Sequence, residues 1–265
     1  MTETRLRAPV LVDSITDFVP GPAAQVIVTG SHCGPGIAQY LAGASVLGLI
    51  ANDAGGRALV ALATLDRFGV AAAAVSSASA RIGRAGDTLE RGDISAANTA
   101  ASSAGVRPGM PAGGAVELLQ RLAPRALPAV VGYGARRREI RREGGVALLL
   151  ADSASLVTAA DAGRIIITGS HGGLVGGAVA RGLRAQARLA VFNDAGVGRD
   201  GAGIARLAVL EAAGVPAVAV AAASADIGSA LSTYRRGVVS AANAGALALG
   251  FRAGFPLRDR LDGLI

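Results

Sequence analysis

The feature that most constrains the fold is an internal repeat. Val-Ile-Val-Thr-Gly-Ser-His at residues 26–32 is matched by Ile-Ile-Ile-Thr-Gly-Ser-His at 165–171. Asn-Asp-Ala-Gly at 52–55 is matched by the same four residues at 193–196. Further matches follow in the same order in both halves of the chain. Such a series of ordered matches is typical of a tandem duplication.

The matches define the predicted domains. We place a first α/β repeat at residues 8–111, a helical and Arg-rich connector at 112–145, and a second α/β repeat at 146–257. The second copy carries small insertions, one of which is the Gly-rich segment 197–203. We expect the two copies to pack with pseudo-twofold symmetry or to merge into one larger sheet.

Each copy has the pattern of a small Rossmann-like α/β unit. Short apolar runs alternate with helical segments, and strands that are apolar on both faces indicate a mainly parallel sheet covered on both sides. The pattern predicts strands at 9–12, 25–29, 46–51, 70–75, 147–151, 164–168, 188–192 and 215–221. It predicts helices at 36–44, 57–68, 95–104, 115–122, 176–187, 203–213 and 240–249.

Composition excludes several classes of protein. With 51% hydrophobic and 17% charged residues, the chain is not a disordered protein. Its apolar stretches are shorter than the ~20 residues of a membrane-spanning helix, and no signal-peptide core is present, so we expect a soluble, cytoplasmic protein. All 26 basic residues are arginine, which excludes a lysine Schiff base with pyridoxal phosphate and a P-loop nucleotide site. The absence of tryptophan argues against stacking platforms for single-stranded nucleic acid.

Polar signatures fall where the predicted strands end, which is where parallel sheets bind ligands. Thr-Gly-Ser-His continues with Cys-Gly in the first copy and Gly-Gly in the second, and each turn leads into a predicted helix. Free N–H groups at a helix start favour a carboxylate, a phosphate or a developing oxyanion. We therefore predict substrate contacts from Ser31, Ser170, Gly34, Gly172 and Gly173. The alternative is a plain strand–helix turn with an N-cap serine.

The chain has only two histidines, His32 and His171, and they occupy the same position of the repeat. At least one is expected to act as a general acid or base, or as a ligand of a divalent metal, the alternative being a packed or solvated histidine without a role. Asp53 and Asp194 end the next strand of each copy, where a carboxylate could orient the imidazole, bind the metal or take a proton. Each Asp is equally suited to cap the helix that follows.

Four further polar residues are candidates for substrate contacts: Asn52, Asn193, Ser79 and Ser224. The asparagines precede the two aspartates and either hold the loop or donate to a substrate oxygen. The serines follow the fourth predicted strand of each copy, where we favour capping of the next turn over ligand binding.

The copies differ at two places that bear on chemistry. Cys33 stands opposite Gly172, and a thiol at a helix start beside His32 is expected to have a lowered pKa and to be nucleophilic. The alternative is that this position only needs a small residue. Segment 197–203 exists in full only in the second copy. It is either a mobile lid with Arg199 as an anion clamp or an ordinary surface loop.

An arginine cluster lies in the predicted connector. It consists of Arg136, Arg137, Arg138, Arg141 and Arg142. We interpret the cluster as part of an exposed helix or loop that links the copies, with a patch for nucleic acid or an acidic partner as the weaker alternative. Because no RNA-binding or recognition-helix signature accompanies it, a nucleic-acid partner is not expected.

These observations predict an enzyme that acts on a small polar or anionic metabolite at the strand ends, between the two repeats. The preferred reaction is hydrolysis of the C–N bond of an amide or cyclic amide, with His32, His171, Asp53 and Asp194 as acid–base or metal-binding groups. One alternative is an isomerase, racemase or decarboxylase that uses Cys33 or His32 as base. Another is a non-catalytic protein that binds a small anion. Small-residue segments such as 240–249 favour a homo-oligomer.

Overall fold

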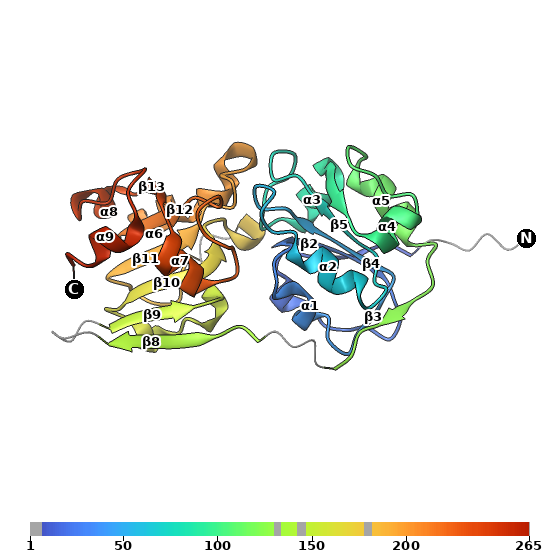
Figure 1. The fold of residues 1–265 in the computed structure, drawn as a ribbon, viewed down its shortest axis with the longest axis horizontal. Coiled ribbons are helices and arrows are strands. Elements are labelled where there is room, and N and C mark those ends of the chain that lie inside the picture. Colours follow the sequence, from blue (N-terminus) through green and yellow to red (C-terminus); the bar gives the residue numbers. More distant parts are fainter. Residues whose placement is uncertain (1–6, 130–133, 142–146, 178–181, 265) are drawn as a thin grey trace, which may run out of the picture. The chain divides into compact units, whose positions relative to one another are not determined.

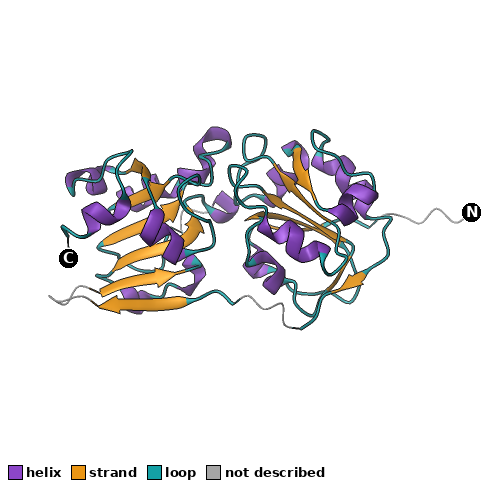
Figure 2. Cartoon of the chain, in the orientation of Figure 1, coloured by secondary structure: helices purple, strands orange, loops and turns teal. Residues whose placement is uncertain are grey.

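The computed structural model describes residues 7–129, 134–141, 147–177 and 182–264. The chain divides into two compact units, residues 1–134 (unit 1) and 135–265 (unit 2) (Figure 1). Each unit is an α/β structure with a mixed, mostly parallel sheet, consistent with a Rossmann-like fold (Figure 2). No helix in the described ranges is long and apolar enough to cross a membrane.

Unit 1 contains a five-stranded sheet in the order β1-β2-β4-β5-β6. The first four strands pair in parallel, and β6 pairs antiparallel with β5. A separate ribbon joins β3 to β7. The strands are β1 (Val10–Val12), β2 (Val26–His32), β3 (Ser45–Val46), β4 (Gly48–Asn52), β5 (Ala72–Val75), β6 (Ile94–Ala97) and β7 (Arg125–Ala126).

Successive side chains of a strand point to opposite faces of the sheet. Both faces of this sheet are apolar, and helices cover both of them. Ile27 packs in one core with Leu41 and Leu65, next to α1 (Ile37–Tyr40) and α2 (Val60–Asp66). Val28 packs in the other core with Leu119 of α5. The remaining elements of unit 1 are η1 (Ile15–Asp17), α3 (Ala85–Arg91), α4 (Thr99–Ser103) and α5 (Ala112–Leu119).

Unit 2 contains a six-stranded sheet in the order β13-β12-β11-β10-β9-β8. Its four central strands are parallel, and an antiparallel strand lies at each edge. The strands are β8 (Arg137–Arg141), β9 (Ala147–Ala151), β10 (Ile165–His171), β11 (Leu189–Asn193), β12 (Ala217–Val220) and β13 (Val239–Ala242). The helical elements are η2 (Ala154–Leu156), η3 (Ala159–Asp161), η4 (Val175–Gly177), η6 (Arg199–Ile204), α6 (Arg206–Ala212), α7 (Ala230–Arg236), α8 (Ala244–Ala248) and α9 (Leu257–Leu261).

The parallel strands follow one another across each sheet in chain order, as β1-β2-β4-β5 and as β9-β10-β11-β12. Ligand crevices of open parallel sheets form where the strand order reverses. The described strands of either sheet contain no such reversal. A binding site at these strand ends must therefore be built by the turns themselves.

The predicted strands are confirmed, with ends shifted by up to three residues. Two predicted helices are partly wrong, because residues 95–97 and 240–242 belong to β6 and β13 and helix begins only after Asn98 and Asn243. Both asparagines are N-caps whose side-chain oxygens accept a backbone N–H. The helix predicted at 176–187 is wrong for the described residues, which form η4 and turns; residues 178–181 lie outside the described ranges. Helices α3 and α7 were not predicted, since their sequences lack a strong apolar period.

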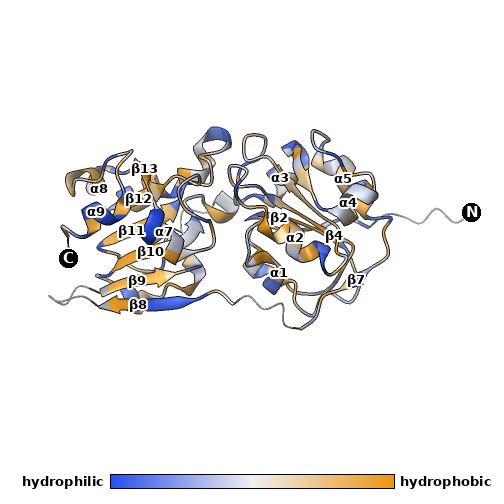
Figure 3. Cartoon of the chain, in the orientation of Figure 1, coloured by the Kyte–Doolittle hydropathy of each residue, from blue (hydrophilic) through white to orange (hydrophobic). Residues whose placement is uncertain are grey.

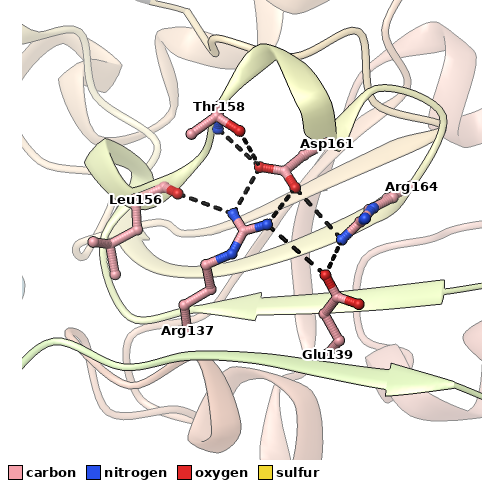
Figure 4. A network of polar contacts seen from close by, with 6 residues as sticks. All are labelled: Arg137, Glu139, Leu156, Thr158, Asp161 and Arg164. Carbon is pink, nitrogen blue, oxygen red and sulfur yellow. Dashed lines mark hydrogen bonds and ion pairs between the residues drawn. The ribbon is translucent and has the colours of Figure 1, made fainter.

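Arg136, Arg137 and Arg138 are exposed as predicted, but residues 137–141 form the edge strand β8 rather than a helix or loop. This strand is hydrophilic along most of its length (Figure 3), yet Ile140 packs against the apolar core. Arg137 donates to both carboxylate oxygens of buried Asp161, at 2.6 and 2.7 Å (Figure 4). Arg137 thus anchors the edge strand β8. The charged side chains of this strand also discourage its pairing with a strand of another molecule. Arg142 lies outside the described residues.

Candidate functional site

The two histidines end corresponding strands and close the turns that follow. His32 ends β2 beside Asn52, and His171 ends β10 beside Asn193. In each turn the imidazole Nδ1 accepts the backbone N–H two residues ahead, from Gly34 and from Gly173, both at 3.1 Å. The predicted placement of both histidines at strand ends is therefore confirmed.

This hydrogen bond determines which ring nitrogen carries the proton. A nitrogen that accepts a hydrogen bond has no proton of its own, so the neutral ring is protonated at Nε2. Burial lowers the pKa of His32 to about 4, and that imidazole is neutral at pH 7. Nδ1 is then engaged with the backbone, and coordination of a metal through Nε2 would require loss of its proton. The geometry suits a hydrogen-bond donor better than a general base or a metal ligand.

The two aspartates are held by backbone N–H groups. Asp53 Oδ1 accepts from Gly55 at 3.1 Å and from Ser77 at 2.9 Å. Asp194 Oδ1 accepts from Gly196 and Ala222, both at 2.8 Å. Each carboxylate thus closes its own turn and ties it to the loop after the next strand, rather than capping a helix.

Burial is the cause of the lowered pKa of His32. The charge of Asp53 acts on Cys33. Across the described ranges, no group of three or more His, Cys, Asp and Glu side chains is arranged to hold a metal ion.

The buried asparagines hold the loops, which is the first of their two predicted roles. Asn52 donates to the Ala80 carbonyl at 3.2 Å and accepts from Ala54 N–H at 2.9 Å. Asn193 makes the same two bonds, to the carbonyl of Ala225 and the N–H of Ala195. Their amide groups are therefore engaged on both sides.

The four serines join neighbouring loops. Ser31 accepts the backbone N–H of Ile15, after β1, at 2.9 Å, and Ser170 accepts that of Ala154, after β9, at 2.8 Å. Ser79 donates to the Ser76 carbonyl at 2.8 Å, and Ser224 makes the corresponding bond to Ala221 at 2.7 Å. Ser79 and Ser224 also accept the backbone N–H groups of Asp93 and Val238, both at 2.9 Å, so each hydroxyl closes its own turn and joins it to a later segment.

The glycines of the signature are needed for close packing. A Cβ at Gly30 would lie 2.2 Å from the backbone nitrogen of Arg84. A Cβ at Gly172 would lie 2.7 Å from the carbonyl oxygen of Gly203. Such distances are impossible without movement of the backbone, so part of the repeated pattern serves the fold rather than a ligand.

The expectation of an activated thiol at Cys33 is wrong. Cys33 is fully buried in the core beside Leu41 and Leu65. Burial and the charge of Asp53 raise the pKa of the thiol to about 12. Helix α1 begins only at Ile37, so Cys33 does not lie at the helix N-terminus and the helix dipole does not lower the pKa of its thiol. Cys33 acts here as a small, neutral core residue.

Segment 197–203 closes on itself through its own backbone. Gly203 N–H donates to the Val197 carbonyl at 2.8 Å, and Val197 has a positive φ of 62°. A β-branched residue in this conformation is strained and indicates a loop held by its surroundings. Arg199 forms an ion pair with Asp200 at 3.7 Å. The segment has the bonding of an ordered surface loop.

Arg206 is a candidate that was not predicted from the sequence. Its side chain is buried, and its Nη2 and Nε donate to the Gly173 carbonyl at 2.8 and 3.3 Å. The guanidinium lies over the ring of Phe192, 4.9 Å from the centroid. Burial lowers the pKa of Arg206 to about 10, so it stays charged at pH 7. Extending the repeat alignment into the helix would have shown this arginine opposite Ala61.

Comparison with known proteins gives no assignment. No protein family, curated protein or solved structure matches the chain.

Proposed function

We propose that this protein binds a small metabolite through a carbonyl or carboxylate oxygen at the turns after β2 and β10. The donors are the Nε2–H groups of His32 and His171. The observation that supports the proposal is the Nδ1 hydrogen bond of 3.1 Å in both turns, which places the ring proton on Nε2.

A neutral imidazole is well suited to this role. An imidazole with a lowered pKa donates to a carbonyl oxygen and polarises it without carrying a charge itself. In His32 the pKa of about 4 keeps the ring neutral across the physiological range. The ligand is therefore an oxygen acceptor rather than a metal ion or a cation.

Hydrolysis of an amide or cyclic amide is a second candidate, and Asp53 favours it. This carboxylate is buried, and its two side-chain hydrogen bonds both go to Oδ1. No described residue donates to Oδ2, which leaves that oxygen able to take a proton from water. The imidazole N–H would then polarise the amide carbonyl, and the carboxylate would take a proton from the attacking water and return it to the amine nitrogen as the C–N bond breaks.

Replacement of each histidine by asparagine tests the binding proposal. Asparagine keeps an oxygen that can accept the turn N–H, as in an Asx turn, but lacks the Nε2 donor. We expect small amides and carboxylates that raise the melting temperature of the wild type to have no effect on the His32→Asn, His171→Asn double variant. Unchanged ligand stabilisation of this double variant would refute the proposal.

Hydrolysis has a separate test. Asp53→Asn should leave ligand binding in place and abolish release of ammonia or amine from any amide that the wild type hydrolyses. Absence of hydrolysis by the wild type across a panel of linear and cyclic amides would leave binding as the function. Binding and turnover are thus judged by different variants.

We also propose that the units arose by tandem duplication. The support is that hydrogen bonds recur at matched positions, such as Asn98 Oδ1 with Ala72 N–H and Asn243 Oδ1 with Ala217 N–H. Each unit expressed alone should then fold and show the same turn hydrogen bond by NMR. A homo-oligomer remains a prediction for sedimentation analysis.

A further inference from the structure

The turns after β2 and β10 differ in charge. In unit 2, Arg206 N–H donates to the Gly172 carbonyl at 2.7 Å, and its side chain reaches the next residue of the turn. In unit 1 the corresponding bond runs from Ala61 N–H to the Cys33 carbonyl at 3.4 Å. The residue that makes this backbone hydrogen bond is thus an arginine, with a guanidinium group, in unit 2 and an alanine, with a methyl group, in unit 1.

Arg206 is a buried cation without a carboxylate partner among the described residues. It is 5% exposed, and its contacts are the Gly173 carbonyl and the Phe192 ring. A guanidinium has five N–H donors, and the two bonds to Gly173 use one on Nε and one on Nη2. A buried charge is costly unless it is paired, so this arrangement favours an anion from outside the chain.

The guanidinium lies at the residue that the histidine also holds. His171 accepts the N–H of Gly173, while Arg206 donates to the carbonyl of Gly173. The imidazole and the guanidinium are therefore both hydrogen-bonded to Gly173, and each is a group that can donate to a ligand oxygen.

We propose that Arg206 sets the ligand class of unit 2: the turn after β10 takes a carboxylate, and the turn after β2 takes a neutral carbonyl oxygen. This assignment rests on the proposed function of the two turns. A carboxylate is favoured over a phosphate because His171 is the only titratable side chain in residues 171–177 and its Nδ1 accepts a hydrogen bond, so this turn supplies no second cation. Guanidinium and carboxylate also match in their planar, two-point geometry.

The test compares acetate, acetamide and inorganic phosphate on the full chain labelled with 15N at arginine and histidine. We expect acetate to shift the Arg206 Nε–H signal saturably, whereas acetamide, which has the same shape without the charge, does not. Arg206→Met should weaken acetate binding by about tenfold or more, the effect of losing a charge-assisted hydrogen bond. Arg235→Met removes an exposed arginine of α7 and should leave acetate binding unchanged.

Arg206→Lys keeps the charge and should retain a preference for acetate over acetamide, which separates loss of charge from loss of fold. Equal acetate affinity in wild type and Arg206→Met, an Arg206 signal that acetate does not move, or a stronger response to phosphate would overturn the assignment. The proposed function is judged separately, by the Nε2–H signals of His32 and His171. If acetamide shifts the two histidine signals and acetate binds equally well to wild type and to Arg206→Met, only the assignment of Arg206 fails.

Discussion

Replacing Asp161 by asparagine removes one charge from the ionic network that joins Arg137, Glu139, Asp161 and Arg164 in unit 2. Asp161 is fully buried and accepts two hydrogen bonds from Arg137, at 2.6 and 2.7 Å (Figure 4). It accepts two more from Thr158, at 2.8 and 3.2 Å, and Arg164 lies 3.5 Å away. Asparagine keeps the size of the side chain but turns one acceptor oxygen into a donor that faces other donors.

The expected loss follows from this geometry. One charge-assisted hydrogen bond contributes ~1.5–3 kcal/mol. The remaining Coulomb attraction is reduced by solvent, since 34% of the Arg137 side chain is exposed. We expect the free energy of unfolding of unit 2 to fall by about 2–3 kcal/mol. At a urea dependence of ~1–3 kcal/mol per molar, the midpoint should fall by about 1 M or more.

The assay is urea denaturation followed by circular dichroism, because the chain has no tryptophan. The matched control is Asp226→Asn, which breaks an ion pair to Arg236 in the same unit. The Asp226 side chain is 72% exposed, so its loss should cost less than about 1 kcal/mol. Equal midpoints for the two variants would refute the reasoning.

The pH dependence gives a second check. The Arg137 guanidinium holds the pKa of Asp161 well below its usual range. The stabilisation is therefore present above the unfolded pKa of about 3.9 and is lost as the pH falls toward the folded value. The difference between wild type and Asp161→Asn should shrink below about pH 4. A difference that stays constant down to pH 2 would contradict the assigned cause.

Three further predictions test single residues. The folded pKa of His32, about 4, lies below its unfolded value of about 6.5, so wild-type stability should fall as the pH is lowered through this window, and urea midpoints of His32→Asn should show less of this loss. Cys33 should not react with a thiol reagent at pH 8 until the protein is unfolded; rapid labelling of the folded protein would contradict its buried position. Gly30→Ala should destabilise by more than about 3 kcal/mol through its clash with Arg84, whereas Gly86→Ala in α3, where nothing lies within 4 Å, should change stability by less than about 1 kcal/mol in thermal unfolding.

The sequence predicted strand positions well because buried strands have a strong local signal. Runs such as Leu148–Ala151 are apolar on both faces and end at turn residues. Strand β8 was missed for the opposite reason, since its arginines hide the single apolar residue Ile140 that enters the core. An edge strand in which only one side chain is buried carries almost no such signal.

The sequence predicted the positions of the candidate residues at strand ends but not the hydrogen bonds that they make. Matched repeats placed His32 and His171 at strand ends, and both are found there. Whether a ring nitrogen accepts the backbone N–H of Gly34 depends on the turn conformation, which the sequence does not specify. Cys33 was given a low pKa from its neighbours in sequence, whereas its neighbours in space are apolar side chains and Asp53.

The sequence by itself determined the alternation of strands and helices and the polar residues at the strand ends, because both follow from local periodicity. Only the tertiary structure decided which of those residues are already engaged and which could meet a ligand. Asp53 is bound to Ser77, 24 residues ahead, and Arg206 is bound to Gly173, 33 residues behind. Such contacts depend on how strands pair and loops pack across each sheet, and no local pattern records them.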